Sequence, residues 1–470
     1  MGTVSSFLKS SGFYFVGNIL SKLILFFLLP IYTTYIAPED FGYYDVACTY
    51  LTLIVTFLFI DIYVAIMRFH FDGKEDDNSI LTNGIFIFSC SLLLYLVAGI
   101  TIELIHPIRY WIYIYICGIG VALNNLLGYL ARAYGYNKRF ATSGVVATFV
   151  TASSNILLIV GLGFDVKSLF ISMALGFFVQ IMMLEQKIKL HKKLSLKHFN
   201  ISLLKKLFWF SLPLSLNSLA YWLLTGYSNI AISAKLGLEA NGIYSIGAKF
   251  GLAINLFSTC FTMAWQEVIF QKGSERSKEL DLFYSKAINL LLAIVIIGSA
   301  LFIQAASILF PYLIGTDYAA SYGIIPLCIL AAIMGALSAF MGQIYAAMKS
   351  TNIIIYSTGT ACLLNIVLVP LFIRYMGLEG AILAVVTSSL ANVALRILLI
   401  RRKLRIHLNA KPLFLLLLGL SASLYVYYQN SIPFSIIYII VITGITLFVY
   451  RNDLKSFAFR FLKPQQSNDE

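Results

Sequence analysis

Apolar runs constrain this chain more than any other feature of its sequence. Of its 470 residues, 60% are hydrophobic and only 12% are charged, whereas soluble domains are about 45–50% apolar and about 25% charged. One membrane-crossing helix needs about 20 apolar residues, and the chain has enough for many. The composition therefore indicates an all-α polytopic membrane protein and excludes a disordered chain, a collagen-like chain and a disulfide-stapled secreted domain.

Fourteen apolar stretches are long enough to be membrane-spanning helices. The first lacks a small-residue cleavage site, so we interpret it as a retained span rather than a signal peptide. The predicted spans are residues 11–36, 43–69, 80–104, 110–134, 142–163, 168–190, 207–234, 242–270, 284–313, 320–347, 353–375, 378–400, 412–430 and 431–450.

The distribution of Lys and Arg predicts the orientation of these spans. The termini and every second connection together hold 27 of the 34 Lys and Arg residues, the opposite connections hold 4, and 3 lie within spans. Because positively charged connections stay in the cytoplasm, both termini are predicted to be cytoplasmic. The basic charge is thereby explained as a topology signal, and no nucleic-acid partner is expected.

An internal repeat divides the chain. The turn Ile36–Tyr44 is echoed 200 residues later at Leu236–Tyr244, with a Glu, a Gly and a Tyr in register. Six spans per repeat predict two parallel lobes around a central cavity. We expect an N-terminal six-helix lobe at residues 1–190, a basic cytoplasmic linker at 191–206, a second six-helix lobe at 207–402, and two extra helices with a basic cytoplasmic tail at 403–470.

Two segments, Gly17–Lys22 and Leu29–Asp45, resemble the opening of O-antigen-type polysaccharide flippases, which belong to the multidrug/oligosaccharidyl-lipid/polysaccharide exporter superfamily. Shorter similar pieces follow at Ala65–Phe69, Ser211–Leu214, Gly242–Ser245 and Ala264–Glu267. In the related lipid II flippases a Ser-Arg pair of the first span lines the cavity, and Ser21 and Lys22 occupy the matching positions. Many relatives carry an Asp-Arg pair in span seven where this chain has Ser228 and Asn229, so no role of that pair can be transferred.

The resemblance implies a multi-pass transporter of the bacterial inner membrane. Its substrate would be an undecaprenyl-diphosphate-linked oligosaccharide, moved from the cytoplasmic to the periplasmic leaflet by alternating access for the synthesis of O-antigen, capsule or exopolysaccharide. The expected partners are membrane lipids, a polymerase and other polysaccharide assembly proteins.

Two lysines within the spans suit an anionic substrate. Lys22 lies roughly 16 Å along span one and Lys249 roughly 10 Å into span eight, at 1.5 Å per residue. Charged residues within spans are costly and mark function by default, so we predict that both contact the diphosphate. Lys22 could instead only stabilise packing, and Lys249 could extend to the membrane surface.

Further side chains are candidates for gating, coupling and sugar contact. Arg68 and Glu267 occupy nearly equivalent repeat positions and are predicted to pair as an inner gate, or alternatively to anchor their helices at the interface. Asp61 is predicted to couple transport to H+ or Na+, with a structural hydrogen-bonding role equally open. Asn217 and Tyr221 of span seven could bind sugar or could only pack.

No catalytic residue, metal site or organic cofactor is predicted, since the five histidines are scattered and no Walker motif occurs. Two alternatives to the flippase remain open. A cation-coupled drug antiporter of the same superfamily would need acidic residues in its cavity, whereas the charges within the spans are predominantly basic. An O-antigen polymerase or glycosyltransferase would need a large external loop, whereas every predicted periplasmic connection has about ten residues or fewer.

Overall fold

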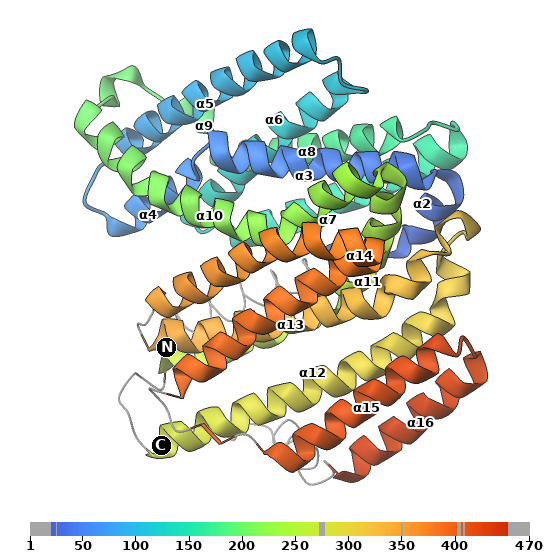
Figure 1. Ribbon diagram of the computed structural model, residues 1–470. Coiled ribbons are helices and arrows are strands. Elements are labelled where there is room, and N and C mark those ends of the chain that lie inside the picture. The colour runs from blue at the N-terminus through green and yellow to red at the C-terminus, as the bar shows by residue number, and fades with distance from the viewer. Residues whose placement is uncertain are drawn as a thin grey trace, which may run out of the picture. The chain divides into compact units, whose positions relative to one another are not determined.

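The computed structural model describes residues 20–24, 26–271, 278–348, 351–401, 406–407 and 409–449. Throughout these residues the regular structure is helical (Figure 1). The helices are α2 (Leu29–Tyr35), α3 (Pro38–Leu58), α4 (Ile62–Asp72), α5 (Asp77–Ile105), α6 (Trp111–Ala133), α7 (Asn137–Ile156), α8 (Lys167–Ile188), α9 (Leu190–Lys193), α10 (Ile201–Leu236), α11 (Leu238–Gln271), α12 (Lys278–Leu313), α13 (Ser321–Ala347), α14 (Thr351–Ile400), α15 (Ala410–Tyr428) and α16 (Ile432–Val449), with one π-helical turn at Leu157–Gly161 and 3₁₀ turns at Leu196–His198 and Thr316–Tyr318.

The predicted all-α polytopic class is confirmed. Nine helices among the described residues are long and apolar enough to cross a membrane, so the count of fourteen spans stays a prediction. The α14 helix covers two predicted spans, and Gly377 interrupts it with φ 59° and ψ −135°. This conformation favours glycine, because a Cβ would clash with the backbone.

The chain folds into two compact units. Unit 1 comprises Met1–Lys249, Ile314–Ser321 and Ile355–Asn392, and unit 2 comprises Phe250–Leu313, Tyr322–Ile354 and Val393–Glu470. The predicted lobes were defined by the sequence repeat, whereas these units are defined by packing. The boundaries of the lobes therefore stay a prediction.

The main apolar core of unit 1 joins the first-half helices to the start of α10. Buried residues of α3, α4, α5, α6 and α8 pack together, with the rings of Phe59 and Phe88 4.8 Å apart. Leu203 and Leu207, from the first two turns of α10, are buried in the same core. The predicted seventh span therefore begins packed against the first half of the chain.

The connections of unit 1 gather at two opposite ends, as Figure 1 shows for α5, α6, α7 and α8. Residues 36–38, 106–110 and 162–166 meet at one end, where Arg109 Nη1 lies 2.6 Å from Asp40 Oδ1 and Tyr110 OH lies 2.5 Å from Asp165 Oδ2. We call this the Arg109 end. Residues 73–76, 134–136 and 189–200 meet at the other, which we call the basic end because it carries most of the lysines of unit 1.

The α15 helix attaches to α12 and α13 within unit 2 by polar contacts. The Gln304 side-chain amide donates to the Ser423 carbonyl oxygen (2.6 Å) and to Ser423 Oγ (2.8 Å). Tyr322 of α13 and Tyr427 of α15 stack 4.3 Å apart, and each hydroxyl donates to the other residue's carbonyl oxygen. These contacts join α15, the first of the two predicted extra helices, to α12 and α13.

Replacing Gln304 by Leu should destabilise this attachment by about 1 kcal/mol, because two hydrogen bonds in an apolar environment are lost. We expect a lower midpoint of thermal unfolding for the detergent-solubilised protein. Ser421→Ala is the matched control, since Ser421 is exposed and its hydroxyl donates to the Leu417 carbonyl oxygen of its own helix. An unchanged midpoint for Gln304→Leu would contradict the assignment.

Candidate transport site

A polar seam joins α3 and α4 to α10. Asn229 Nδ2 donates to Asp45 Oδ2 (2.8 Å) and to Thr49 Oγ1 (3.0 Å). Further along, Ser215 Oγ donates to the Thr56 carbonyl oxygen (3.2 Å). The residues of each helix share one face, because their spacings follow the helical repeat. A line of hydrogen-bonding groups therefore lies between the first half of the chain and α10.

Asp61 ends this seam at a break in the second predicted span. The side chain is 6% exposed, and its two carboxylate oxygens accept from Tyr63 OH (2.7 Å) and Ser218 Oγ (2.6 Å). Ile60 and Asp61 both have positive φ, 45° and 51°, so α3 stops at Leu58 and α4 starts at Ile62. Left-handed backbone costs about 1–2 kcal/mol for each such residue, and strain of this kind gathers at functional sites.

The facing helix is weakened near the same place. Pro213 lies inside α10, five residues before Ser218, and proline removes one backbone hydrogen bond from a helix. Interrupted helices at membrane depth expose backbone groups that can bind substrates or ions. The Asp61 region thus combines a buried carboxylate with a helix break between α3 and α4 and a proline in the facing helix α10.

The two copies of the sequence repeat touch each other at the Arg109 end. A Cβ on Gly42 would overlap the Leu238 carbonyl oxygen and lie 2.7 Å from the backbone nitrogen of Gly242. A Cβ on Gly242 would in turn overlap the carbonyl oxygen of Pro38. Asn241 Nδ2 also donates to the Gly42 carbonyl oxygen (3.2 Å). Only glycine at positions 42 and 242 permits α3 and α11 to approach this closely, and we call the contact the glycine crossing.

The connection between α12 and α13 covers the same end. Tyr318 OH donates to the carbonyl oxygen of Ile36 (2.9 Å), and the Gly315 N–H donates to Thr33 Oγ1 (3.0 Å). All of these residues belong to unit 1. The turn after the first span is therefore held on two sides by second-half residues.

The Arg109 end also carries a network of charges outside the spans. Arg109 Nη2 donates to Tyr110 OH (3.0 Å), which donates to Asp165. The hydrogen bond with Tyr110 raises the pKa of Arg109. Desolvation opposes ionisation of Asp165, but the Tyr110 hydroxyl and the Lys167 N–H and charge outweigh it and lower the Asp165 pKa. These contacts stabilise the charged form of both groups.

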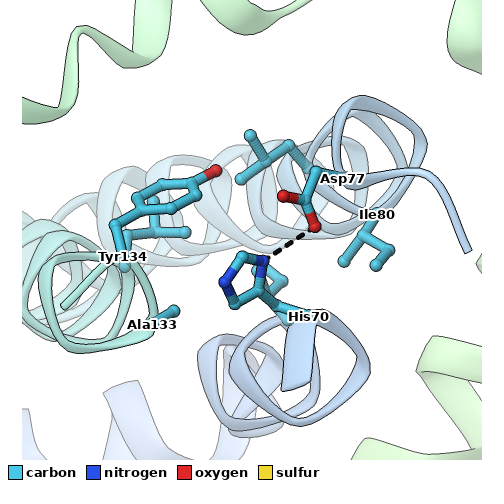
Figure 2. Close-up of a pocket in the computed structure, with 8 residues that line it drawn as sticks. His70, Asp77, Ile80, Ala133 and Tyr134 are labelled. Carbon is cyan, nitrogen blue, oxygen red and sulfur yellow. Dashed lines mark hydrogen bonds and ion pairs between the residues drawn. The ribbon is translucent and has the colours of Figure 1, made fainter. Parts of the chain in front are cut away.

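At the basic end, a His–Asp pair joins α4 to α5. His70 Nδ1 lies 2.7 Å from Asp77 Oδ1, and the His70 ring meets the Tyr134 ring edge-on at 5.2 Å. Figure 2 shows the imidazole directed at the Asp77 carboxylate within a small pocket between α4, α5 and α6. Both side chains have a partner here, so the pair fixes the ends of three helices.

The predicted phosphate contacts lie in different surroundings. Lys249 lies on α11, two turns after Gly242. Its Nζ atom lies 5.9 Å from the centre of the ring of Phe41, the residue that precedes Gly42 of the glycine crossing. Among the described residues, no carboxylate oxygen lies within 4.0 Å of it. Ser21 and Lys22 lie in a helical stretch at residues 20–24 and are partly exposed.

The other predicted site residues are only partly described. Asn217 and Tyr221 lie in α10 and Glu267 lies in α11, but the side chains of all three are outside the described residues. Arg68 Nη2 lies 3.1 Å from Asp72 Oδ1, and its side chain is 60% exposed. The Arg68–Glu267 gate stays a prediction. Within the described part of the chain, no cluster of three or more His, Cys, Asp or Glu side chains could hold a metal ion.

Sequence reasoning did not single out Asp45, Thr49 or Ser218 as site residues. Asp45 lies seven residues after the start of α3. The predicted span begins at residue 43, so in the sequence Asp45 lies at the edge of that span. The one signal in the sequence that could indicate a site at Asp45 is its negative charge at the start of an apolar stretch. The partners Asn229 and Ser218 lie more than 150 positions away, and no local pattern reveals them.

Comparisons with known proteins agree with this architecture. The sequence matches the family described as "Polysaccharide biosynthesis protein" over residues 7–271, more than half of the chain. Among curated proteins, no sequence is significantly similar to the chain.

Solved transporters share its fold. The lipid II flippase MurJ in an inward closed conformation superposes with a TM-score of 0.71 at 14% identity, covering 94% of this chain and 99% of that one. MATE-family multidrug resistance transporters of the MOP superfamily also superpose. An inward-facing structure has a TM-score of 0.61 (15% identity, 86% and 95% covered), and an outward-facing structure has 0.57 (15% identity, 85% and 95% covered). The chain therefore belongs to the polysaccharide biosynthesis protein family and has the fold of MOP-superfamily transporters.

Proposed function

We propose that the protein is a flippase rather than an enzyme, and that it moves undecaprenyl-diphosphate-linked oligosaccharides from the cytoplasmic to the periplasmic leaflet of the bacterial inner membrane. Membership of the polysaccharide biosynthesis family and a fold similar to that of a lipid II flippase support this. Lys249 carries the proposal, because it is a cation within the helical bundle that has no carboxylate within 4.0 Å among the described residues. A cation in that position suits a diphosphate.

Transport by alternating access requires the Arg109 end to close and to open in turn. The glycine crossing and the Tyr318–Ile36 contact bring the two repeats together there, so this end is closed between α3 and α11. Release of a large glycan on that side requires the crossing to separate. The seam between α3 and α10 uses few hydrogen bonds, and such bonds in membranes average only about 0.6 kcal/mol each, so helix separation is energetically accessible.

A cation-coupled drug antiporter is the second candidate function. It is favoured by the two carboxylates of the seam, Asp45 and Asp61, and by the similarity of the fold to MATE transporters. Both carboxylates accept hydrogen bonds from neutral side chains, which lowers their attraction for a cationic drug. Drug resistance conferred by the wild-type protein, without any effect on glycan export, would favour the antiporter.

Replacing Lys22 and Lys249 by alanine should reduce export of lipid-linked glycan. A hydrogen bond to a charged group contributes about 1.5–3 kcal/mol, so each loss should lower the export rate by about tenfold or more. Export would be measured in a strain lacking its own flippase, at equal levels of membrane-inserted protein. Lys235→Ala, at the exposed end of α10, is the control. Unchanged export in the double variant would exclude the lysines from the site.

Asp61 is proposed to bind the coupling H+ or Na+, since a carboxylate shared between two helices can link ion occupancy to their separation. In proteoliposomes we expect an imposed ion gradient to accelerate flipping by the wild type but not by Asp61→Asn, which keeps the shape and removes the charge. Ser218→Ala removes one hydrogen bond and should only weaken the response. An undiminished gradient response in Asp61→Asn would show that Asp61 serves structure alone.

Adding a methyl group at the glycine crossing should open the Arg109 end. In a cysteine-free background, Thr49→Cys reports whether reagents can pass the crossing. Thr49 lies on α3, seven residues after Gly42, and is 9% exposed. Gly42→Ala should raise labelling of this cysteine by an impermeant maleimide several-fold and should slow export. Gly298→Ala is the control, because a Cβ there meets nothing within 4 Å. Equal labelling in both variants would mean that the crossing does not close this end.

A further inference from the structure

The segment between α8 and α10 carries a dense and ordered array of lysines. Residues 187–206, which we call the linker segment, include seven lysines and no Asp or Glu. The short α9 helix and the 3₁₀ turn at Leu196–His198 lie within it. The charge alone would satisfy the topology rule in a chain of any conformation, so an ordered structure here suggests an additional use.

Side chains of α5 hold the backbone of the linker segment in place. Asn83 is fully buried, and its amide donates to the carbonyl oxygen of His198 (3.2 Å) and accepts from the backbone N–H of Asn200 (3.1 Å). Thr82 Oγ1 donates to the Ser195 carbonyl oxygen (3.3 Å). The backbone of the linker segment is therefore held on unit 1 at Ser195, His198 and Asn200.

The lysines divide into two groups. Three are engaged with the protein: Lys193 Nζ lies 3.7 Å from the Tyr134 ring centre, Lys187 Nζ lies 5.1 Å from that of Tyr136, and Lys206 Nζ lies 2.9 Å from Glu75 Oε1. The other four, Lys189, Lys192, Lys197 and Lys205, are exposed, and within the described residues no carboxylate oxygen lies within 4.0 Å of them.

Exposed apolar side chains accompany these lysines at the start of α10. Phe199, Ile201 and Trp209 are 41%, 58% and 65% exposed. They flank the start of α10, which corresponds to a predicted membrane span, so they lie where a span leaves the bilayer. Aromatic side chains favour the headgroup region of a membrane, so a bilayer whose headgroup region includes Phe199 and Trp209 would bring the lysines of the same segment near lipid phosphates.

We propose that the linker segment is a binding surface for the headgroups of anionic phospholipids in the leaflet that it faces. Basic clusters next to a membrane span attract anionic lipids. Here four lysines lie on a backbone that α5 holds, have no carboxylate oxygen within 4.0 Å among the described residues, and are accompanied by exposed apolar side chains. The surface is separate from the transport site, so lipid binding can be tested without measuring export.

Trp209 provides the readout. The purified full chain is reconstituted in phosphatidylcholine vesicles containing increasing fractions of brominated phosphatidylglycerol or brominated phosphatidylcholine. The Trp209 contribution is the difference in fluorescence from Trp209→Phe. We expect half-maximal quenching of Trp209 at a several-fold lower mole fraction of the brominated phosphatidylglycerol than of the brominated phosphatidylcholine.

Two triple variants with the same change in net charge distinguish a local surface from a general effect. Lys192, Lys197 and Lys205 replaced together by Gln should abolish the preference for phosphatidylglycerol. Lys167, Lys235 and Arg374 replaced by Gln should preserve it, as should Lys192, Lys197 and Lys205 replaced by Arg. Equal quenching by both lipids in the wild type, or a preference that survives the linker substitutions, would overturn the proposal. Displacement of the brominated phosphatidylglycerol by traces of undecaprenyl diphosphate would also overturn it, in favour of substrate docking.

Discussion

Polar groups inside a bilayer must find their partners within the protein, and this requirement shapes the centre of unit 1. Asp45, Thr49 and Asp61 lie on the predicted second span, and each bonds to a small polar side chain of α10. The predicted seventh span is consequently attached to the first half of the chain by a few hydrogen bonds in addition to the apolar packing of Leu203 and Leu207. Such an attachment orients the helix, while its modest strength still allows movement.

The α3 helix connects the features that a transporter would need to coordinate. It begins at the glycine crossing, carries Asp45 one turn later and ends at the break before Asp61. An uninterrupted helix transmits displacement along its length, so separation at Gly42 and rearrangement at Asp61 would be mechanically linked. The strained residues Ile60 and Asp61 lie at the point where such a helix would pivot.

Charge is distributed along the molecule according to what each region faces. The Arg109 end neutralises its few charges internally, through Asp40 and Asp165. Within the bundle, Lys249 Nζ lies 5.9 Å from the centre of the Phe41 ring, and among the described residues no carboxylate oxygen lies within 4.0 Å of it. At the basic end, some lysines lie over tyrosine rings and others are exposed. A lipid with a phosphate headgroup would thus meet positive charge both at the membrane surface and along its path.

Local sequence determined the helical class, the apolar stretches and the uneven distribution of basic residues, because hydropathy and charge act over about twenty residues. The repeat at Gly42 and Gly242 and the buried acid Asp61 could also be recognised in the sequence. Tertiary structure alone decided that the two glycines touch, that Asn229 meets Asp45, that Ser218 meets Asp61 and that Asn83 pins the linker segment. Each of these contacts joins residues more than 100 positions apart, and nothing in the propensities of Ile60 indicates a left-handed backbone. Such contacts depend on how helices pack together, which no local pattern encodes.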